Sequence, residues 1–203
     1  TGLMLSILTA QDPFVIDTSL SSSLPQSIAN SIEIADVDND GYNDIIMSGY
    51  DSTRFGLFID VVKVNSQGAL TSGFSTNFIT YPDTIAEFSG GLGNLDLSDV
   101  NLDGSIDIYL NGSARSELLM NSSSGYFSES NWLQNMFVIH SNGKWGDVNM
   151  DGKPDLFLMG VKQPADNILN ELYLNTGTYL DEDPTTIFPA LFTGSSAWAD
   201  YDN

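Results

Sequence analysis

The residues of this chain that are best suited to chemistry are aspartates recurring at one spacing in three short segments. These segments are DVDNDGYND (Asp36 to Asp44), DVNLDGSID (Asp99 to Asp107) and DVNMDGKPD (Asp147 to Asp155). We call them loop 1, loop 2 and loop 3, and each has oxygen-bearing side chains at positions 1, 3, 5 and 9 and glycine at position 6. A calcium ion prefers about 6 to 8 oxygen ligands. The spacing therefore predicts three calcium-binding loops.

The predicted ligands are the side chains at positions 1, 3, 5 and 9 and the backbone carbonyl of position 7. They are Asp36, Asp38, Asp40, Tyr42 and Asp44 in loop 1; Asp99, Asn101, Asp103, Ser105 and Asp107 in loop 2; and Asp147, Asn149, Asp151, Lys153 and Asp155 in loop 3. Loop 1 has four carboxylates, whereas an asparagine at position 3 leaves three in each of the others. We therefore expect loop 1 to bind calcium most tightly.

Two other interpretations of these loops fit the sequence less well. An EF-hand needs a glutamate at position 12 and flanking helices, but position 12 here is Met47, Leu110 or Leu158 inside an apolar run. Solvated Asp/Gly turns are common singly, because both residues suit turn backbones. The glycine at position 6 fits either kind of turn, since it adopts positive φ at little cost. The threefold repetition favours calcium loops over simple turns.

The elements that must hold these loops are short β-strands arranged in repeats. Each complete copy (IADVDNDGYNDIIMSG, LSDVNLDGSIDIYLNG, WGDVNMDGKPDLFLMG) has an apolar strand after the loop, and a truncated copy, WADYDN, keeps only Asp200 and Asp202. A third strand is expected at Glu117 to Asn121 or Asn170 to Asn175, and a fourth at Gly125 to Phe127 or Thr186 to Phe188. Four strands per unit are typical of a propeller blade. The fold is therefore predicted to be an all-β β-propeller.

The whole chain, residues 1–203, is predicted to be one propeller region. Residues 1–27 would be a partial blade with strands at Gly2 to Leu8 and Phe14 to Asp17. Blades would follow at 28–88, 89–137 and 138–193, and residues 194–203 would begin another blade with a strand at Ser195 to Ala199. A propeller closes with about four to eight blades. We therefore favour part of a larger ring over two end pieces that combine into a fourth blade.

The composition limits the classes of partner. The chain has 27 acidic and 6 basic residues and a formal net charge of −21, which argues against nucleic acid and anionic membrane surfaces. It has no cysteine, so disulfides and thiolate metal sites are impossible. The apolar run Gly2 to Leu8 is too short to span a membrane and no basic residue precedes it, so we expect no membrane insertion.

The repeated D-x-[DN]-x-D-G-x-x-D pattern before an apolar strand, with an Ala/Gly-Asp step after Trp145 and Trp198, resembles the FG-GAP and VCBS repeats of integrin-α-like propellers. The VCBS type is the closer comparison, because the FG and GAP signatures are not clear. The resemblance implies a seven-bladed propeller with calcium loops on one side of the ring. It also implies a secreted or cell-surface protein.

Other residues carry weaker signals. His140 is the one histidine, and we expect it to be a hydrogen-bonded or surface residue near a strand end rather than a catalytic base. Trp132, Trp145 and Trp198 could stack on sugars, but the last two share one repeat position, which favours packing between blades. Asn111-Gly-Ser and Asn121-Ser-Ser are glycosylation sequons, which arise often in Ser-rich chains.

These observations favour a calcium-stabilised module that recognises an extracellular protein or polysaccharide and is not an enzyme. One alternative is a fragment of a polysaccharide-active enzyme, such as a lyase-like propeller, with His140 as its local candidate. Another is a purely structural spacer between other domains. If the chain is part of a ring, its open sheet edges could also pair with a second copy.

Overall fold

The computed structural model describes residues 28–51, 56–80, 94–111, 116–133, 138–162, 167–191 and 194–199. These residues form three four-stranded antiparallel sheets, which confirms the all-β prediction and is consistent with propeller blades. The expected strands at Gly2 to Leu8 and Phe14 to Asp17, and the half-loop with Asp200 and Asp202, lie outside the described residues. The blade boundaries remain a prediction.

Each sheet takes its strands in chain order, so that every strand pairs with the one before it. Sheet 1 contains β1 (Ile28–Ala35), β2 (Asp44–Asp51), β3 (Gly56–Val64) and β4 (Leu70–Thr80). Sheet 2 contains β5 (Asn94–Ser98), β6 (Asp107–Asn111), β7 (Glu117–Asn121) and β8 (Phe127–Glu129). Sheet 3 contains β9 (Val138–Gly146), β10 (Asp155–Lys162), β11 (Asn167–Asn175) and β12 (Leu180–Glu182).

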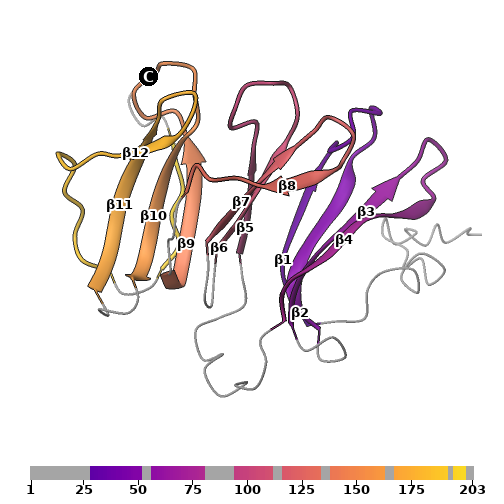
Figure 1. Cartoon of the computed structure of the whole chain (residues 1–203), viewed down its shortest axis with the longest axis horizontal. Coiled ribbons are helices and arrows are strands. Elements are labelled where there is room, and N and C mark those ends of the chain that lie inside the picture. The colour runs from indigo at the N-terminus through magenta and orange to yellow at the C-terminus, as the bar shows by residue number, and fades with distance from the viewer. Residues whose placement is uncertain are drawn as a thin grey trace, which may run out of the picture.

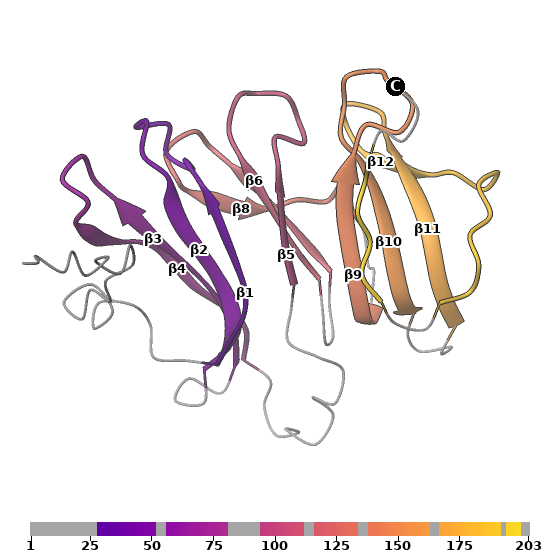
Figure 2. The same ribbon diagram turned by 180° about the vertical axis from the view of Figure 1, so that it is seen from behind.

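The three sheets stand side by side in chain order (Figures 1 and 2). Neighbouring sheets contact each other through their first and second strands, with β1 and β2 against β5, and β5 and β6 against β9. Sheet 2 therefore has a neighbour on each face. This explains why all five residues of β6 are buried, because a strand covered on both faces reads as a continuous apolar run rather than an alternating one.

Two apolar clusters fill the spaces between the sheets. Sheets 1 and 2 enclose a cluster that includes Val37, Ile46, Ile59, Ile108 and Leu119. Sheets 2 and 3 enclose another, which is formed by Val100, Tyr109, Leu118, Leu133, Val138, Leu156, Leu158, Leu169, Tyr173 and Leu180. Each cluster contains the valine at position 2 of a loop, Val37 or Val100, so loops 1 and 2 are anchored in the core between sheets.

Two predicted strands in the C-terminal part are wrong. The fourth strand of sheet 3 is β12 (Leu180–Glu182) and not Thr186 to Phe188, because Phe188 packs on Phe157 instead, with ring centroids 4.6 Å apart. The segment Ser195 to Ala199 forms no strand. Side chains rather than a backbone ladder hold this segment, since Ser196 and Trp198 hydrogen-bond to β9 residues.

The other strand predictions that fall on described residues are confirmed with small changes. Glu117 to Asn121 is β7, and Asn170 to Asn175 lies within the longer β11. The strand expected at Gly125 to Phe127 begins only at Phe127, as β8, because Gly125 has φ 71°, a turn conformation.

All three aspartate loops lie at the same end of the molecule. They connect β1 to β2, β5 to β6 and β9 to β10, at the top in Figure 1. The turns from β3 to β4, β7 to β8 and β11 to β12 lie at this end too, because the strands alternate in direction. We call this the loop end.

Candidate cation-binding loops

The three loops have one backbone conformation. Glycine at position 6 has φ of 90°, 86° and 83° in loops 1, 2 and 3, which is the left-handed region where glycine avoids the steric cost of a Cβ. Position 4 is also left-handed, with φ of 59° at Asn39, 59° at Leu102 and 58° at Met150. The fourth position was not anticipated from the sequence, because asparagine suits this conformation but leucine and methionine do not.

The carboxylate at position 1 fixes the turn. Asp36 accepts hydrogen bonds from the backbone N–H groups of Asp40 at 3.1 Å and Gly41 at 2.8 Å. Asp99 and Asp147 accept the same pair of bonds in loops 2 and 3, at 2.8 to 3.0 Å. The side chain at position 5 then accepts the N–H of position 7, at 2.9 to 3.0 Å.

The aspartate at position 9 is buried in every loop. Asp44, Asp107 and Asp155 are each 0% exposed and stand at the first residue of β2, β6 and β10. In loop 2, Asp107 accepts the N–H of Val100 at 2.9 Å and that of Asn121 at 2.8 Å. One carboxylate thus joins its own loop to the end of the third strand of its sheet.

Burial raises the pKa of all three position 9 carboxyls, and the other aspartates of the same loop raise it further. For Asp107 the pKa reaches about 6. Backbone N–H donors act in the opposite direction. Desolvation therefore outweighs these donors, so each position 9 carboxylate is costly to ionise in its buried site.

Loop 1 has the donor set that best fits a metal ion. One oxygen each from Asp36, Asp38 and Asp40 can be chosen so that all three lie within 4.8 Å of one another, and these residues could hold a metal ion. Asp38 Oδ1 is excluded from solvent and has no hydrogen-bond partner among the described residues. A buried carboxylate oxygen without a donor is costly, and coordination of a hard cation would satisfy it.

Lysines contact two of the loops. Lys63 from β3 lies 2.9 Å from Asp38 Oδ2, and it also donates to the backbone carbonyl of Ser124 in sheet 2 at 3.3 Å. In loop 3, Lys153 Nζ lies 2.5 Å from Asp151 Oδ2, and this hydrogen bond lowers the pKa of Asp151. Lys153 stands at position 7, where the backbone carbonyl is the predicted ligand.

Loop 2 differs from both in having no lysine contact among the described residues. Asn101 at position 3 accepts the N–H of Asp103 at 3.1 Å and donates to Asp103 Oδ2 at 3.0 Å. Ser105 Oγ is buried and has no hydrogen-bond partner among the described residues, so a hydroxyl oxygen stands free beside the expected carbonyl ligand of position 7.

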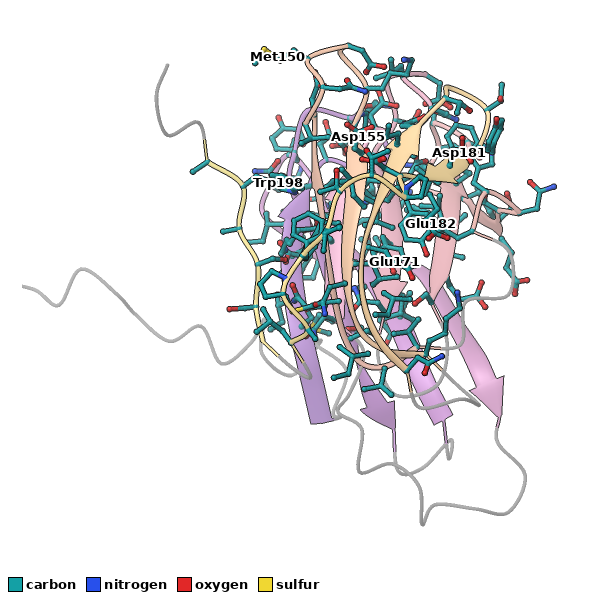
Figure 3. All side chains as sticks on the ribbon, turned by 90° about the vertical axis from the view of Figure 1, so that its left-hand side faces the viewer. Met150, Asp155, Glu171, Asp181, Glu182 and Trp198 are labelled. Atoms are coloured by element: carbon teal, nitrogen blue, oxygen red, sulfur yellow. The ribbon has the colours of Figure 1, made fainter. Side chains whose placement is uncertain are left out.

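Loop 3 is the most exposed of the three. Val148 at position 2 is 39% exposed, whereas Val37 and Val100 are 0% and 1% exposed. In Figure 3, Met150 lies at the tip of this loop and Asp155 lies lower, among the strands. The difference follows from position, since loops 1 and 2 are each covered by the sheet that follows them.

Two asparagines at the end of the third strand of sheets 2 and 3 were missed as functional residues. Asn121 and Asn175 are 3% and 2% exposed. The side-chain amide of Asn121 donates to the carbonyls of Val37 at 2.7 Å and Ile106 at 3.1 Å. The only sequence signal is the repeated Glu-Leu-x-x-Asn at residues 117–121 and 171–175.

The asparagines of the two glycosylation sequons are buried. Asn121 is engaged as described, and Asn111 is 0% exposed. With its amide oriented to satisfy both neighbours, Asn111 donates to the Ser141 carbonyl at 2.8 Å and accepts the Gly143 N–H at 3.2 Å. Neither asparagine is accessible for modification in the folded protein.

The tryptophans pack against protein, as the repeat position indicated. Trp145 packs on the cluster between sheets 2 and 3, edge-on to Tyr109 with centroids 5.7 Å apart. Trp198 lies against Phe157 at 6.3 Å and donates to the Lys144 carbonyl at 3.1 Å. Trp132 also packs on this cluster. His140 lies within β9, and its side chain is outside the described residues.

The part of the chain that contains loops 2 and 3 is similar to a known repeat. The family model of the FG-GAP-like repeat matches residues 99–158, which begin at the first aspartate of loop 2 and continue past loop 3 into β10. Residues 99–158 are an FG-GAP-like repeat. An aspartate loop of the same spacing and a four-stranded sheet of the same strand order are also found in residues 28–80.

No curated protein matches the chain. Among the described residues, no helix is long and apolar enough to cross a membrane.

Proposed function

We propose that this FG-GAP-like module binds calcium in loops 1, 2 and 3 and uses it to stabilise the sheets. The observation that carries the proposal is the acidic triad of loop 1, with the solvent-excluded, unpartnered Asp38 Oδ1. Carboxylate, amide and carbonyl oxygens are the ligands that calcium prefers. The position 9 aspartates begin β2, β6 and β10, so a cation held there would fasten each loop to a strand.

The affinities should differ between loops. Loop 1 has four carboxylates with Lys63 beside one of them, and loop 2 has three without a lysine contact. Loop 3 has three, one of which is paired with Lys153. We expect loop 1 to bind most tightly and loop 3 most weakly, because the ammonium of Lys153 competes with the cation and the loop is more exposed.

Calcium titration by calorimetry, combined with melting curves in chelator, tests this proposal. Three binding events are expected, and each site adds about 2.7 kcal/mol of stability when calcium stands at a hundredfold its dissociation constant. The variant Asp36→Asn, Asp40→Asn should lose one event. Absence of any calcium binding, or a melting temperature unaffected by chelator, would overturn the proposal.

We further propose that the loop end recognises an extracellular protein or polysaccharide. Support comes from exposed tyrosines at this end: Tyr42 in loop 1, Tyr126 in the turn after β7 and Tyr179 in the turn after β11 are 42%, 73% and 50% exposed. Tyrosine is enriched at recognition surfaces because it combines apolar area with a hydroxyl. An extracellular site, where calcium is abundant, suits weak loops of this kind.

A glycan and protein array probed with and without calcium tests the recognition proposal. A ligand should be retained in calcium and lost in chelator, and Tyr126→Ser with Tyr179→Ser should weaken it. The exposed Ile187, 92% exposed and in the C-terminal segment, offers a control in Ile187→Ser, which should bind normally. An array without any ligand would favour the structural spacer.

We propose a binding module rather than an enzyme. The alternative, a polysaccharide-active fragment, depends on His140. If a depolymerising activity is found and survives in His140→Ala, a catalytic role of His140 is excluded. Activity lost in this variant, with the melting temperature unchanged, would instead favour the enzyme.

Self-association through open edges also remains a proposal. Ile32 and Ile34 on β1 are 57% and 63% exposed, which adds apolar surface to the edge strand of sheet 1. The mass in solution, measured by sedimentation, should exceed that of one chain if the edges pair, and a strictly monomeric mass would contradict this.

A further inference from the structure

Asn121 and Asn175 join neighbouring loops by hydrogen bonds, as each position 9 aspartate joins its own loop to a strand of the same sheet. The backbone N–H of Asn121 donates to Asp107 of loop 2 at 2.8 Å. Its side-chain amide crosses to sheet 1 and donates to the carbonyl of Val37, position 2 of loop 1, at 2.7 Å. One residue therefore holds two loops that belong to different sheets.

Asn175 makes the equivalent bonds one sheet further on. Its backbone N–H donates to Asp155 of loop 3 at 2.8 Å, and its amide donates to the carbonyl of Val100 in loop 2 at 2.8 Å. The second amide hydrogen is also used, since each asparagine donates to the position 8 carbonyl of its own loop, Ile106 or Pro154, at 3.1 Å.

The bonds join into one continuous path between the three loops. Val37 and Val100, which accept the amides, donate their own N–H groups to Asp44 at 3.2 Å and to Asp107 at 2.9 Å. The path thus runs from Asp155 through Asn175 and Val100 to Asp107, and from there through Asn121 and Val37 to Asp44. Every link is a hydrogen bond between described residues.

The two asparagines are fully engaged. The side-chain oxygen of Asn121 accepts the N–H of Gly125 at 3.2 Å, and that of Asn175 accepts the N–H of Gly177 at 2.8 Å. A buried amide with all its donors and its acceptor paired has one favourable position. It therefore transmits a shift in one loop to the other rather than absorbing it.

We propose that Asn121 and Asn175 are positioning residues that couple calcium binding between adjacent loops, so that an occupied loop raises the affinity of its neighbour. The inference rests on the proposed calcium function. When a cation orders one loop, the asparagine is ordered with it, and the neighbouring loop then loses less conformational freedom on binding. Coupling of this kind typically changes affinity about 5- to 150-fold and is reciprocal.

The test measures loop 2 while loop 1 is disabled. Asp36→Asn with Asp40→Asn removes two loop 1 ligands and leaves Lys63 and Asp38 in contact. Calcium affinity of loop 2 is followed in the full chain by the NMR signal of the Gly104 amide, which donates to Asp99. In the otherwise natural chain, disabling loop 1 should weaken loop 2 by about 5-fold or more.

Asn121→Ala should abolish this effect, so that disabling loop 1 no longer alters the affinity of loop 2. Asn175→Ala is the matched control, because it deletes the same bonds one sheet away and should leave the coupling of loops 1 and 2 intact. If Asn121 had only a structural role, Asn121→Ala would weaken calcium binding by loops 1 and 2. Disabling loop 1 would then still lower the calcium affinity of loop 2 by the same factor as in the natural chain.

The outcomes separate the two proposals. Failure of the natural chain to bind calcium would overturn the proposed function itself. If the natural chain shows three binding events but disabling loop 1 leaves the calcium affinity of loop 2 unchanged, the coupling alone is overturned. This second comparison does not use Asn121→Ala, so it decides the question even if that variant fails to fold.

Discussion

At the scale of single residues, position 4 of the loops carries the clearest strain. Met150 has φ 58° and is 91% exposed, so it occupies the left-handed region without burying its side chain. Such a conformation costs about 1 to 2 kcal/mol for an ordinary L-residue, whereas asparagine visits it more readily. Loop 1 has Asn39 at this position.

Met150→Asn should therefore raise the free energy of unfolding by up to about 1 kcal/mol, since strain is relieved and no burial is lost. Denaturant unfolding in chelator is the measurement. Ile187→Asn is the control, because Ile187 is equally exposed and its φ is not positive; its change should stay within about 0.5 kcal/mol. Equal effects of the two substitutions would contradict the strain argument.

The sequence predicted the turns of the three loops because they are local, and it missed residues whose partners are distant. Aspartate spacing alone placed Asp44, Asp107 and Asp155 at strand starts. The role of Asn121 was not visible in the sequence, because its partner Val37 lies 84 residues away. A long-range hydrogen bond of this kind leaves no local spacing to read.

At the scale of elements, strand prediction worked where an apolar run had a partner strand. It failed where an aromatic residue packs on the face of a sheet and does not join a strand. β6, β7 and β10 follow directly from continuous apolar runs. Thr186 to Phe188 looks similar in sequence, but Phe188 covers the outer face of sheet 3 beside Phe157. Whether an aromatic residue joins a strand or packs on the face of a sheet depends on the neighbouring surface.

The approach of β9 to sheet 2 depends on one glycine. A Cβ on Gly143 would lie 2.3 Å from the ring of the buried Tyr109. Gly143→Ala should therefore lower the free energy of unfolding by about 1 to 3 kcal/mol, because the two sheets must separate or Tyr109 must move.

Thermal or denaturant unfolding measures this loss. Gly194→Ala is a matched control, since its Cβ would meet only the Met159 side chain, at an ordinary 3.5 Å from Sδ and 4.0 Å from Cε. If both alanine variants unfold alike, close packing of β9 is not what Gly143 provides.

At the scale of the whole molecule, charge opposes the compact state. The net charge is −21, and many of the carboxylates belong to loops 1, 2 and 3, whose backbones lie at one end of the molecule (Figure 1). The packed sheets must hold these groups close together, so mutual repulsion destabilises the fold when no cation is bound.

The melting temperature in chelator should therefore rise as potassium chloride is raised from 0.01 M to 0.15 M, over which the screening length falls from about 30 Å to about 8 Å. With saturating calcium the rise should be smaller, because the loop charges are already offset. Scanning calorimetry in the four conditions checks this. A salt effect as large with calcium as without it would indicate that the destabilising charges lie outside the loops.

The asparagine bridges give the array a direction, because each reaches back to the sheet before it. In sheet 1 the equivalent residue is Val64, whose backbone N–H donates to Asp44 at 2.9 Å as those of Asn121 and Asn175 do to their aspartates. Its aliphatic side chain has no amide to donate. The bridges therefore lie at the joints between sheets 1 and 2 and between sheets 2 and 3, so under mechanical load Asn121→Ala should weaken the first joint and Asn175→Ala the second.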